Sequence, residues 1–506
     1  MKLLYSTFDK IVFRSASNVT GGNGEIFLNE RPHPAPAAAG GHRVHSERVA
    51  AALLLLAILF ACGVGATEPE SGPDGRTETF RLTTVYAAGM ATVPTFRRAL
   101  GYTMHHGGDV TTADKSNGHD KHADQPGARL PRPWIPVDLS VAPNGELWLI
   151  QRLQQSPDFD DMSECPVDAK RPADCEALLG STVTLRQPQA AKAASVANGR
   201  ATLVIDYNAW HFMRRPSAIA FGAAQVWLEP NDPGAMHDKR RLLDKRVAFK
   251  NTFATCAEHR TANFSDQPFF IGPTLWTADP AIYNGTKGAY DWSNGAHLDM
   301  VHGTAYCMGI AFERDTRYWT FNGNFGALDL YDFGAPHFPG HYYHNNATVT
   351  RYRFGDNALT RLPNVPSNMV LVGNDLFIAD SGNGRLVAFD TAAKGRFAEF
   401  HFSLPPELQR IQVLEGVPLR DIASRQTLGK LWGEEVAPSG LALLNKQTLA
   451  LANHASGHIT LLDLDGKVLR TIDTGLGKGI GGMTALGGAL YFAHMVTRKV
   501  YRLEIK

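Results

Sequence analysis

One pattern recurs six times between residues 136 and 494 and limits the fold more than any other feature of the sequence. Each copy has a short apolar run, a tight turn and a second apolar run that ends in a polar residue. Asn144-Gly145 and Gly373-Asn374 are dipeptides typical of such turns, so each copy predicts a β-hairpin. Hairpins of this kind cannot bury their apolar faces alone and must stack on neighbouring copies. The copies span residues 136–151, 216–229, 307–322, 366–380, 438–453 and 482–494.

A third strand follows several of the hairpins, which gives units of three or four strands. These strands are expected at residues 326–333, 384–390, 457–463 and 499–505. Six such units predict an all-β, six-bladed β-propeller over residues 133–506. The chain ends after the third strand of the last unit, so a strand from upstream is expected to complete that unit. Residues 79–87 alternate like a strand and are our candidate, within a linker that covers residues 67–132.

The N-terminal part carries the features of an export signal. Residues 49–66 form an apolar stretch that follows basic residues and ends in small ones, which is typical of a signal peptide. Because the stretch begins late, residues 1–66 are interpreted as an over-extended N-terminus plus signal peptide. Cleavage after Ala66, lipid attachment at Cys62 and an uncleaved membrane anchor all remain open. Each predicts an exported protein that is periplasmic, extracellular or a membrane-anchored lipoprotein.

Four cysteines follow this leader, and an even number in an exported chain predicts disulfides. Cys165 and Cys175 pair by proximity, which leaves Cys256 to pair with Cys307. Four cysteines allow three pairings, so the connectivity stays open at this point.

The charge of the chain says little about its partners. The 50 Lys and Arg residues nearly balance the 49 Asp and Glu residues, so no nucleic-acid partner is predicted. We expect a monomer that binds a small molecule or a peptide.

Two segments resemble the NHL repeat. DLFIADSGNGRLVAFD, residues 375–390, has the order of the NHL signature: an apolar strand, Ala-Asp, four residues, an Arg and a second apolar strand. LALANHASGHITLLD, residues 449–463, has His458 in place of that Arg. The resemblance covers roughly residues 133–506 and implies a propeller, a scaffold that carries lyases, lactonases, quinoprotein dehydrogenases and pure binding modules.

Two groups of enzymes that this chain resembles in fold imply different metals. Peptidyl-hydroxyglycine lyases take zinc-ligating histidines from the starts of first strands, where this chain has Ser217, Met308, Ser367 and Ser439 instead. Gluconolactonase and paraoxonase enzymes hold calcium with Glu, Asn and Asp at inner strand ends. The chemically similar residues here are Glu229, Asn322, Asp380 and Asn453.

Polar residues end the second strands of all six hairpins. In a propeller blade, the start of the first strand and the end of the second lie on one face, so these residues are expected around one mouth of the central channel. Loops that lead to the first strands, and the residue after Asn453, add histidines and an aspartate to this face. The strand ends are Gln151, Glu229, Asn322, Asp380, Asn453 and His494, and the additional residues are His211, His297, Asp299, His302 and His454.

This mixture of side chains leaves two kinds of metal site open. Imidazoles suit zinc, copper or iron, whereas oxygen ligands suit a hard cation such as calcium. The histidine site consists of His297, His302, His454 and His494, and the oxygen site of Glu229, Asn322, Asp380 and Asn453. The segment 332–348 carries His337, His341 and His344, and its position after a third strand predicts a separate site on the opposite face.

Together these features predict an exported, metal-dependent hydrolase or lyase that acts on a small polar molecule, with zinc or calcium as the metal. The expected catalytic residues are Asp380, His211 and Asp299, and the expected substrate-binding residues are Arg214, Arg215 and Tyr306. The alternative is a non-catalytic propeller whose polar face binds a peptide, a glycan or a partner protein.

Overall fold

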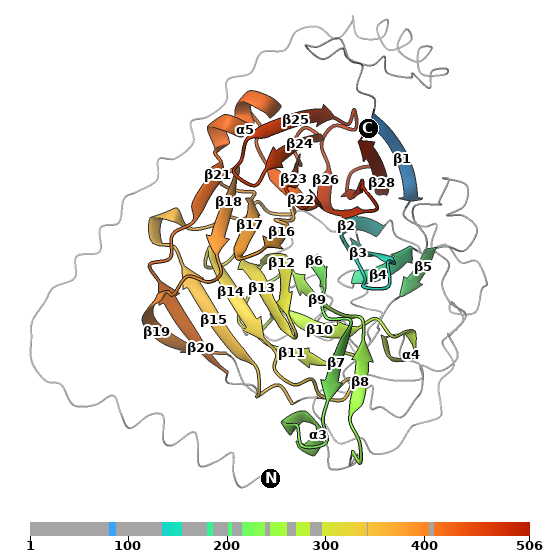
Figure 1. Ribbon diagram of the computed structural model, residues 1–506, viewed down its shortest axis with the longest axis vertical. Helices are drawn as coiled ribbons and strands as arrows, with labels where there is room; N and C mark the ends of the chain where they lie inside the picture. The colour runs from blue at the N-terminus through green and yellow to red at the C-terminus, as the bar shows by residue number, and fades with distance from the viewer. Residues whose placement is uncertain are drawn as a thin grey trace, which may run out of the picture. The chain divides into compact units, whose positions relative to one another are not determined.

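Antiparallel strands make up most of the regular structure (Figure 1). The computed structural model describes residues 80–87, 134–153, 180–185, 201–204, 215–237, 243–260, 270–283, 296–341, 343–403 and 409–505. These residues belong to one compact unit, Pro69–Lys506. Their helices are the short α3 (Pro233–His237), α4 (Pro280–Tyr283), α5 (Arg425–Trp432) and the 3-10 turn η5 (Gly355–Asn357). No helix in these ranges is long and apolar enough to cross a bilayer.

Six sheets contain four or more strands. The first has β2 (Trp134–Val141), β3 (Leu147–Leu153), β4 (Gly180–Leu185) and β5 (Ala201–Val204), and the second has β6 (Pro216–Phe221), β9 (Thr252–Ala257), β10 (Thr274–Thr277) and β11 (Asp299–Met300). The third has β12 (Cys307–Arg314), β13 (Arg317–Asn322), β14 (Ala327–Asp332) and β15 (Thr348–Arg353), and the fourth has β16 (Met369–Val372), β17 (Asp375–Asp380), β18 (Arg385–Asp390) and β21 (Arg420–Ala423). The fifth has β22 (Pro438–Asn445), β23 (Thr448–Asn453), β24 (His458–Asp463) and β25 (Val468–Asp473), and the sixth has β1 (Phe80–Ala87), β26 (Ile480–Leu486), β27 (Ala489–His494) and β28 (Lys499–Ile505).

The first strands of these sheets stand around a central axis. β2, β6, β12, β16, β22 and β26 contact one another in this order, and β26 contacts β2 again. Five sheets have four strands, and the third has six because β20 (Arg410–Glu415) pairs in parallel with β15 and β19 (Arg396–Phe402) pairs with β20. The expectation of an all-β propeller is confirmed.

The N-terminal strand completes the last sheet, as predicted. β1 pairs antiparallel with β28, from Phe80 opposite Ile505 to Ala87 opposite Lys499. The register covers nearly the whole of both strands, so β28 is not left as an open edge of the sheet. The ring is therefore closed by hydrogen bonds between segments far apart in the sequence.

Five of the six predicted hairpins have the expected pairing, and the second does not. β7 (Gln225–Leu228) was expected to pair with β6, but it pairs with β8 (Val247–Lys250) in a separate two-stranded sheet. The partner of β6 is β9, with Phe221 opposite Phe253. Backbone hydrogen bonds from Gly222 N to the Thr252 carbonyl and from Thr252 N to the Ala223 carbonyl close the base of the β7–β8 insertion. Glu229 therefore does not end an inner strand, and the residue that does is Glu258.

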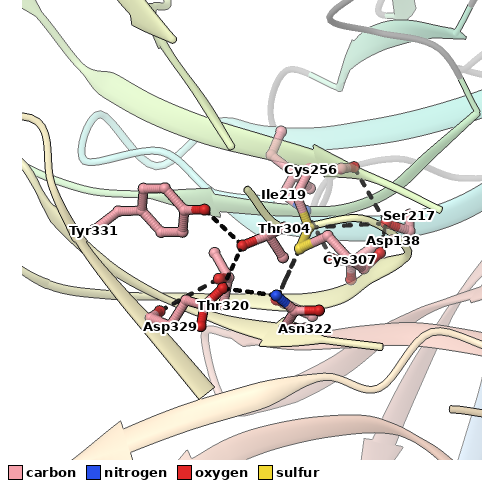
Figure 2. Close-up of a disulfide and its surroundings, with 11 residues drawn as sticks. Asp138, Ser217, Ile219, Cys256, Thr304, Cys307, Thr320, Asn322, Asp329 and Tyr331 are labelled. Carbon is pink, nitrogen blue, oxygen red and sulfur yellow. Dashed lines mark hydrogen bonds between the residues drawn. A yellow bond between two sulfur atoms is a disulfide. The ribbon is translucent and has the colours of Figure 1, made fainter. Parts of the chain in front are cut away.

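A disulfide between Cys256 and Cys307 links the second and third sheets, as Figure 2 shows. The predicted pairing of these two cysteines is confirmed. Cys256 lies in β9 and Cys307 begins β12, and both are buried. Ser217 reinforces the link because its hydroxyl hydrogen is shared between the carbonyl oxygens of the two cysteines. Cys165 and Cys175 lie outside the described residues, as does the whole predicted leader.

Two polar side chains, Asp138 and Asn368, connect the strands at the centre of the ring. A cavity of about 270 Å³ lies between the first strands, and Asp138 of β2 and Asn368 line it. The Asn368 amide donates to Asp138 at 3.0 Å, and Asp138 also accepts from Ile219 N of β6. The Asn368 oxygen accepts from Leu441 N and Met483 N, of β22 and β26. Two side chains thus tie together most of the strands around the axis.

Candidate metal centre

β11 is the outermost strand of the second sheet, and it separates two of the predicted ligands. His297 precedes β11 and His302 follows it. Just beyond His302, the carbonyl of Gly303 accepts from the side chain of Asn322, which ends β13. His302 therefore lies at the face where the second strands end. His297 lies beyond the other end of β11, so the expectation that both histidines open on one face is wrong.

The loop of residues 333–347, between β14 and β15, leaves the third sheet at that other face. In the register of β13 and β14, Asp332 lies opposite Arg317, the first residue of β13, and Ala327 lies opposite Asn322, the last. The chain therefore leaves β14 at the end away from Asn322. The predicted placement of this loop on the face opposite the strand ends is confirmed.

Backbone hydrogen bonds fasten the loop to the segment before β11. His337 N donates to the carbonyl oxygen of Leu298, and Gly340 N donates to that of His297, both at 2.9 Å. These bonds bring His297 to the histidines of the loop. The loop is therefore not a separate site, because its histidines lie in one cluster with His297.

Three buried imidazoles meet at this contact. His297, His337 and His344 each offer a ligand atom, and these atoms lie within 4.8 Å of one another. Their ring centroids are 5.0 to 5.4 Å apart, and the residues are only 1%, 1% and 2% exposed. Among the described residues, no other three His, Cys, Asp or Glu side chains lie close enough together to share a metal ion. The triad can hold a metal ion.

Hydrogen-bond partners outside the triad orient two of the three imidazole rings. His344 Nδ1 lies 3.0 Å from Asp299 Oδ1, and His337 Nδ1 donates to the carbonyl oxygen of Phe338 at 2.6 Å. Within the described part of the chain, Nε2 of His337 has no hydrogen-bond partner, although it is buried. A ligand histidine commonly donates one nitrogen to a carboxylate or carbonyl and binds the metal with the other. The surroundings of His337 and His344 fit that pattern, with Asp299 as the partner of His344.

Burial keeps the His337 imidazole neutral. It lowers the pKa of His337 well below the usual value, and the nearby His344 and His297 lower the pKa further. A metal binds the neutral imidazole, so His337 needs no deprotonation before it ligates at neutral pH.

Helix α3 packs against the histidine loop. A Cβ added to Gly234 would lie 2.9 Å from Cα of His337 and from the carbonyl oxygen of Pro336. The ring of His341 lies 5.9 Å from that of His337 and 5.8 Å from that of His237, the last residue of α3. Thus α3 and His341 border the triad.

Three of the four residues of the expected oxygen site lie at the ends of second strands. Each of them accepts hydrogen bonds from groups beside its own strand. Asn322 accepts from the backbone at Asn324 and Phe325, and Asn453 accepts from Ala437 N. One oxygen of Asp380 accepts from Thr360 N and the other from Asn383 and Arg385. Each residue fixes turns beside its own strand. Glu229, the fourth, lies beyond β7 with a half-exposed side chain 3.9 Å from Arg246.

His454 and His494 lie at the strand-end face, as predicted, but apart from the triad. His494 Nδ1 accepts from Thr497 N, and its Nε2 donates to the Gly477 carbonyl at 3.4 Å. His454 Nδ1 donates to the carbonyl oxygen of Ile480. Burial lowers the pKa of both residues. In the described ranges no third ligand joins them.

Of the other predicted residues, His211 and Arg214 lie outside the described residues. Arg215 and Tyr306 are described, and both lie beside Glu258, whose backbone N donates to Arg215 O. Sequence reasoning missed Glu258, although a short, largely apolar run at residues 252–257 precedes this polar residue, as at the other second strands.

Comparison with known proteins adds information about the fold. Neither a scan against protein-family models nor a search of curated proteins finds a match. The structure is similar to an auxiliary nutrient binding protein from Bacteroides thetaiotaomicron, at 10% identity and a TM-score of 0.39, over 85% of this chain and 81% of that chain. It is also similar to a catalytically inactive virginiamycin B lyase from Staphylococcus aureus with quinupristin, at 9% identity and a TM-score of 0.33, over 74% and 96%. A luciferin-regenerating enzyme matches at 11% identity and a TM-score of 0.31, over 73% and 91%. Similarity at this level concerns the fold and does not extend to chemistry.

Proposed function

We propose that this chain is an exported metal-dependent enzyme, a hydrolase or lyase of small polar molecules, whose metal is bound by His297, His337 and His344. The observation that carries the proposal is the meeting of three buried imidazoles, two of which are already oriented by outer partners. Three neutral nitrogen ligands suit zinc and leave a coordination position for water. Zinc held by these residues would supply a hydroxide near neutral pH or polarise a carbonyl group.

The residues around the triad prepare it for this chemistry. Asp299 sets the ring orientation of His344, and the Phe338 carbonyl sets the tautomer of His337. His341 is 4% exposed and its ring lies edge-on to that of His337, 5.9 Å away, so we propose it as the group that moves a proton at the site. This assignment replaces Asp380, whose oxygens hold turns at the other face.

The proposed ligand set differs from the one expected from the sequence. His302, His454 and His494 leave the set, and His337 and His344 enter it. Calcium is not proposed, because the oxygens of Asn322, Asp380 and Asn453 already accept hydrogen bonds beside their own strands.

Export is part of the proposal. The disulfide between Cys256 and Cys307 supports it, because disulfides persist mainly in oxidising compartments. Attachment to a membrane through a lipid on Cys62 or through an uncleaved anchor is a further proposal. Recovery of the protein from the membrane fraction, with Cys62→Ser shifting it to the soluble fraction, distinguishes the lipid from the anchor.

The test of the metal site is elemental analysis of the full chain purified without chelator. We expect stoichiometric zinc in the wild-type protein and loss of most of it in His337→Ala, because that variant removes one of three ligands. His401→Ala is the matched control, since this histidine is half exposed on β19 and pairs with Glu399. Wild-type protein without stoichiometric metal, or equal metal in both variants, contradicts the proposal.

A structural metal is the second candidate, and the burial of the ligands favours it. Residues that are 1% to 2% exposed offer little access to a substrate. In that case the metal clamps the loop of residues 333–347 to the second sheet, and the propeller is a non-catalytic binding module for a peptide, glycan or protein. Chelation separates the two candidates. A structural metal raises the unfolding temperature without supporting turnover of ester, lactone or amide substrates, whereas a catalytic one supports turnover that zinc restores.

A further inference from the structure

The cavity at the centre of the ring, which we call the central well, is closed at one end and open at the other. The first strands of all six sheets and the residue before β16 line it. At the level of Asp138 and Asn368 the lining is buried, with Ile219 and Leu441 only 3% and 2% exposed. Nearer the hairpin turns the lining is half-buried, at Ser140, Phe312, Leu371, Leu443 and Ala485. The central well therefore opens on the face where the first strands end, which is also the face of the histidine loop.

Backbone packing closes the other end of the central well, before Asp138 and Asn368. A Cβ added to Gly440 would lie 2.7 Å from the carbonyl oxygen of Gly481, and one added to Gly481 would lie 2.5 Å from that of Val137. The inner strands β22, β26 and β2 thus approach one another more closely than side chains would allow. The open route to Asp138 runs from the hairpin turns.

Asp138 is the ionisable residue of the central well, and the other residues of the lining carry no ionisable group. Its carboxylate accepts from Ile219 N at 2.9 Å, Leu139 N at 2.8 Å and the Asn368 amide at 3.0 Å. In the described part of the chain no basic side chain pairs with it. A carboxylate has about four acceptor positions, so one remains for a donor in the central well.

The carboxylate of Asp138 is buried without a counter-charge. Burial raises the pKa of Asp138 to about 6, although the three hydrogen bonds lower it. The groups packed against it, from Ile219, Leu139, Asn368 and Gly482, carry no charge. Above this pKa the ring holds a negative charge that no basic group of the described residues balances. A cation in the central well would balance it, because opposite charges attract strongly where water is excluded.

The buried carboxylate of Glu258, at the ends of the second strands, is a useful contrast. Arg152 and Arg361 pair with it at 3.1 and 3.2 Å, and we call these three residues the Glu258 ion-pair cluster. That cluster is an internally paired structural network. Asp138 differs because it has no basic partner among the described residues and lies beside an open cavity.

The innermost strands turn one backbone edge towards the axis. Ile219 N and Phe221 N of β6 both point inward, because they donate to the side chains of Asp138 and Ser140. The groups on a strand edge therefore repeat every second residue, as expected for an extended chain. No strand of the same sheet pairs with this edge, so its backbone groups are available to other partners.

The same edges line the open part of the central well. Leu441 N and Met483 N point inward, where they donate to Asn368. Leu443 and Ala485 lie two residues further along β22 and β26, with regular pairing in between, and both line the central well. Their backbone N–H and C=O groups therefore face the axis as well. Hydroxyl groups of a ligand can both donate to and accept from such walls.

We propose that the central well binds a small hydroxylated amine, whose cationic nitrogen pairs with Asp138 and whose hydroxyl groups bond to the edges of the first strands. The volume of about 270 Å³ exceeds the about 150 Å³ that holds a benzene molecule, so the ligand has roughly ten non-hydrogen atoms. An amino sugar has this size and these groups. The proposal does not rest on the metal, because the central well contains none of the three histidines.

The test is calorimetric titration of the full chain at pH 7 with glucosamine and, separately, with glucose, at constant ionic strength set with sodium chloride. The two sugars differ at one position, which carries an ammonium group in glucosamine and a hydroxyl group in glucose. We expect saturable binding of glucosamine, at least tenfold tighter than that of glucose. At pH 5 glucosamine is expected to bind roughly tenfold more weakly, because Asp138 is then largely protonated.

Thr484→Lys tests whether the amine binds in the central well. Thr484 is a half-buried residue of the lining, so a lysine there brings a competing cation and leaves the hydrogen bonds of Asp138 in place. We expect it to weaken glucosamine binding at least tenfold. Thr448→Lys, at the half-buried start of β23 and outside the lining, is the matched control and is expected to bind as the wild type does.

Three results overturn the proposal. They are the absence of saturable glucosamine binding by the wild type, equal affinities for glucosamine and glucose, and unchanged affinity in Thr484→Lys. His337→Ala is expected to bind glucosamine as the wild type does, so a failure of the metal site and a failure of the central well are distinguishable.

Discussion

At the scale of single residues, Asp138 shows what a buried carboxyl group does in the centre of the ring. Burial raises the pKa of Asp138 to about 6, although hydrogen bonds from Ile219 N, Asn368 and Leu139 N oppose the shift. A Cβ on Gly482 would lie 1.8 Å from Asp138 Oδ1, so only glycine leaves room for this side chain. The protein keeps a titratable group where the first strands meet.

This raised pKa predicts a pH dependence of stability. A carboxyl group whose pKa is about 6 when folded and 3.8 when unfolded favours folding when protonated. Its contribution is complete below about pH 4 and is lost as the pH rises through about 6, a change of roughly 3 kcal/mol at most. Asp138→Asn removes this titration. As the pH rises over that range, the free energy of unfolding of the wild type is therefore expected to fall relative to that of the variant.

Urea unfolding of both proteins at pH 4, 5, 6 and 7 measures the difference. Asp375→Asn is the matched control, because Asp375 is a half-exposed residue that pairs with Arg420. A difference between Asp138→Asn and the wild type that stays constant with pH would show that Asp138 is ionised throughout, and the argument from burial would fail.

At the scale of elements, alternation of apolar residues predicted the hairpins because each pairing is local. The second hairpin failed because two strands compete for β6. β7 follows β6 after a short turn, whereas β9 follows only after the insertion that contains β7 and β8. Both candidates are short and largely apolar, so the sequence does not distinguish them. The backbone hydrogen bonds that join Gly222 and Ala223 to Thr252 favour β9 as the partner, and these bonds depend on how the insertion closes.

The histidine triad was predicted only in pieces, for a related reason. His297, His337 and His344 were all identified as candidate ligands, and the loop was assigned to the correct face. The two-residue strand β11 has no periodicity from which to predict it, so its direction, and with it the position of His297, was not predictable. Glu258 was missed because the strand before it, β9, was not recognised as the partner of β6.

Helix α3 provides a test of how an element supports the metal site. Gly234→Ala forces a Cβ to within 2.9 Å of the backbone at residues 336–337, so the helix or the loop must move. We expect a loss of about 1 to 3 kcal/mol in stability and weaker zinc binding, because the loop carries two of the three ligands. Gly429→Ala in α5 is the control, since its Cβ meets only Val436 at 3.7 Å and alanine favours helix. Unchanged zinc affinity in Gly234→Ala would show that α3 does not hold the loop.

At the scale of the whole molecule, the propeller places the histidine triad and the Glu258 ion-pair cluster on opposite faces. Strand direction fixes this arrangement, because second strands end on the face of Arg152 and Glu258, while β14 ends on the face of His337. Distant sites that share no partners usually respond additively to mutation. A double variant of His337→Ala and Glu258→Gln is therefore expected to lower the free energy of unfolding, measured by urea unfolding, by the sum of the two single changes.

Closure of the ring gives the last prediction. Tyr86 of β1 is 1% exposed, packs in the core between the sixth and first sheets, and donates from its hydroxyl to Gln151. Tyr86→Ala removes a buried aromatic side chain at the join, so a loss of about 3 kcal/mol or more is expected. Phe80→Ala, at the exposed start of the same strand, is expected to lose less than about 1 kcal/mol. Because β1 pairs with β28, Tyr86→Ala is also expected to speed proteolytic cleavage at both ends of the propeller. Equal losses in both variants would show that β1 adds hydrogen bonds to the sheet without closing the ring.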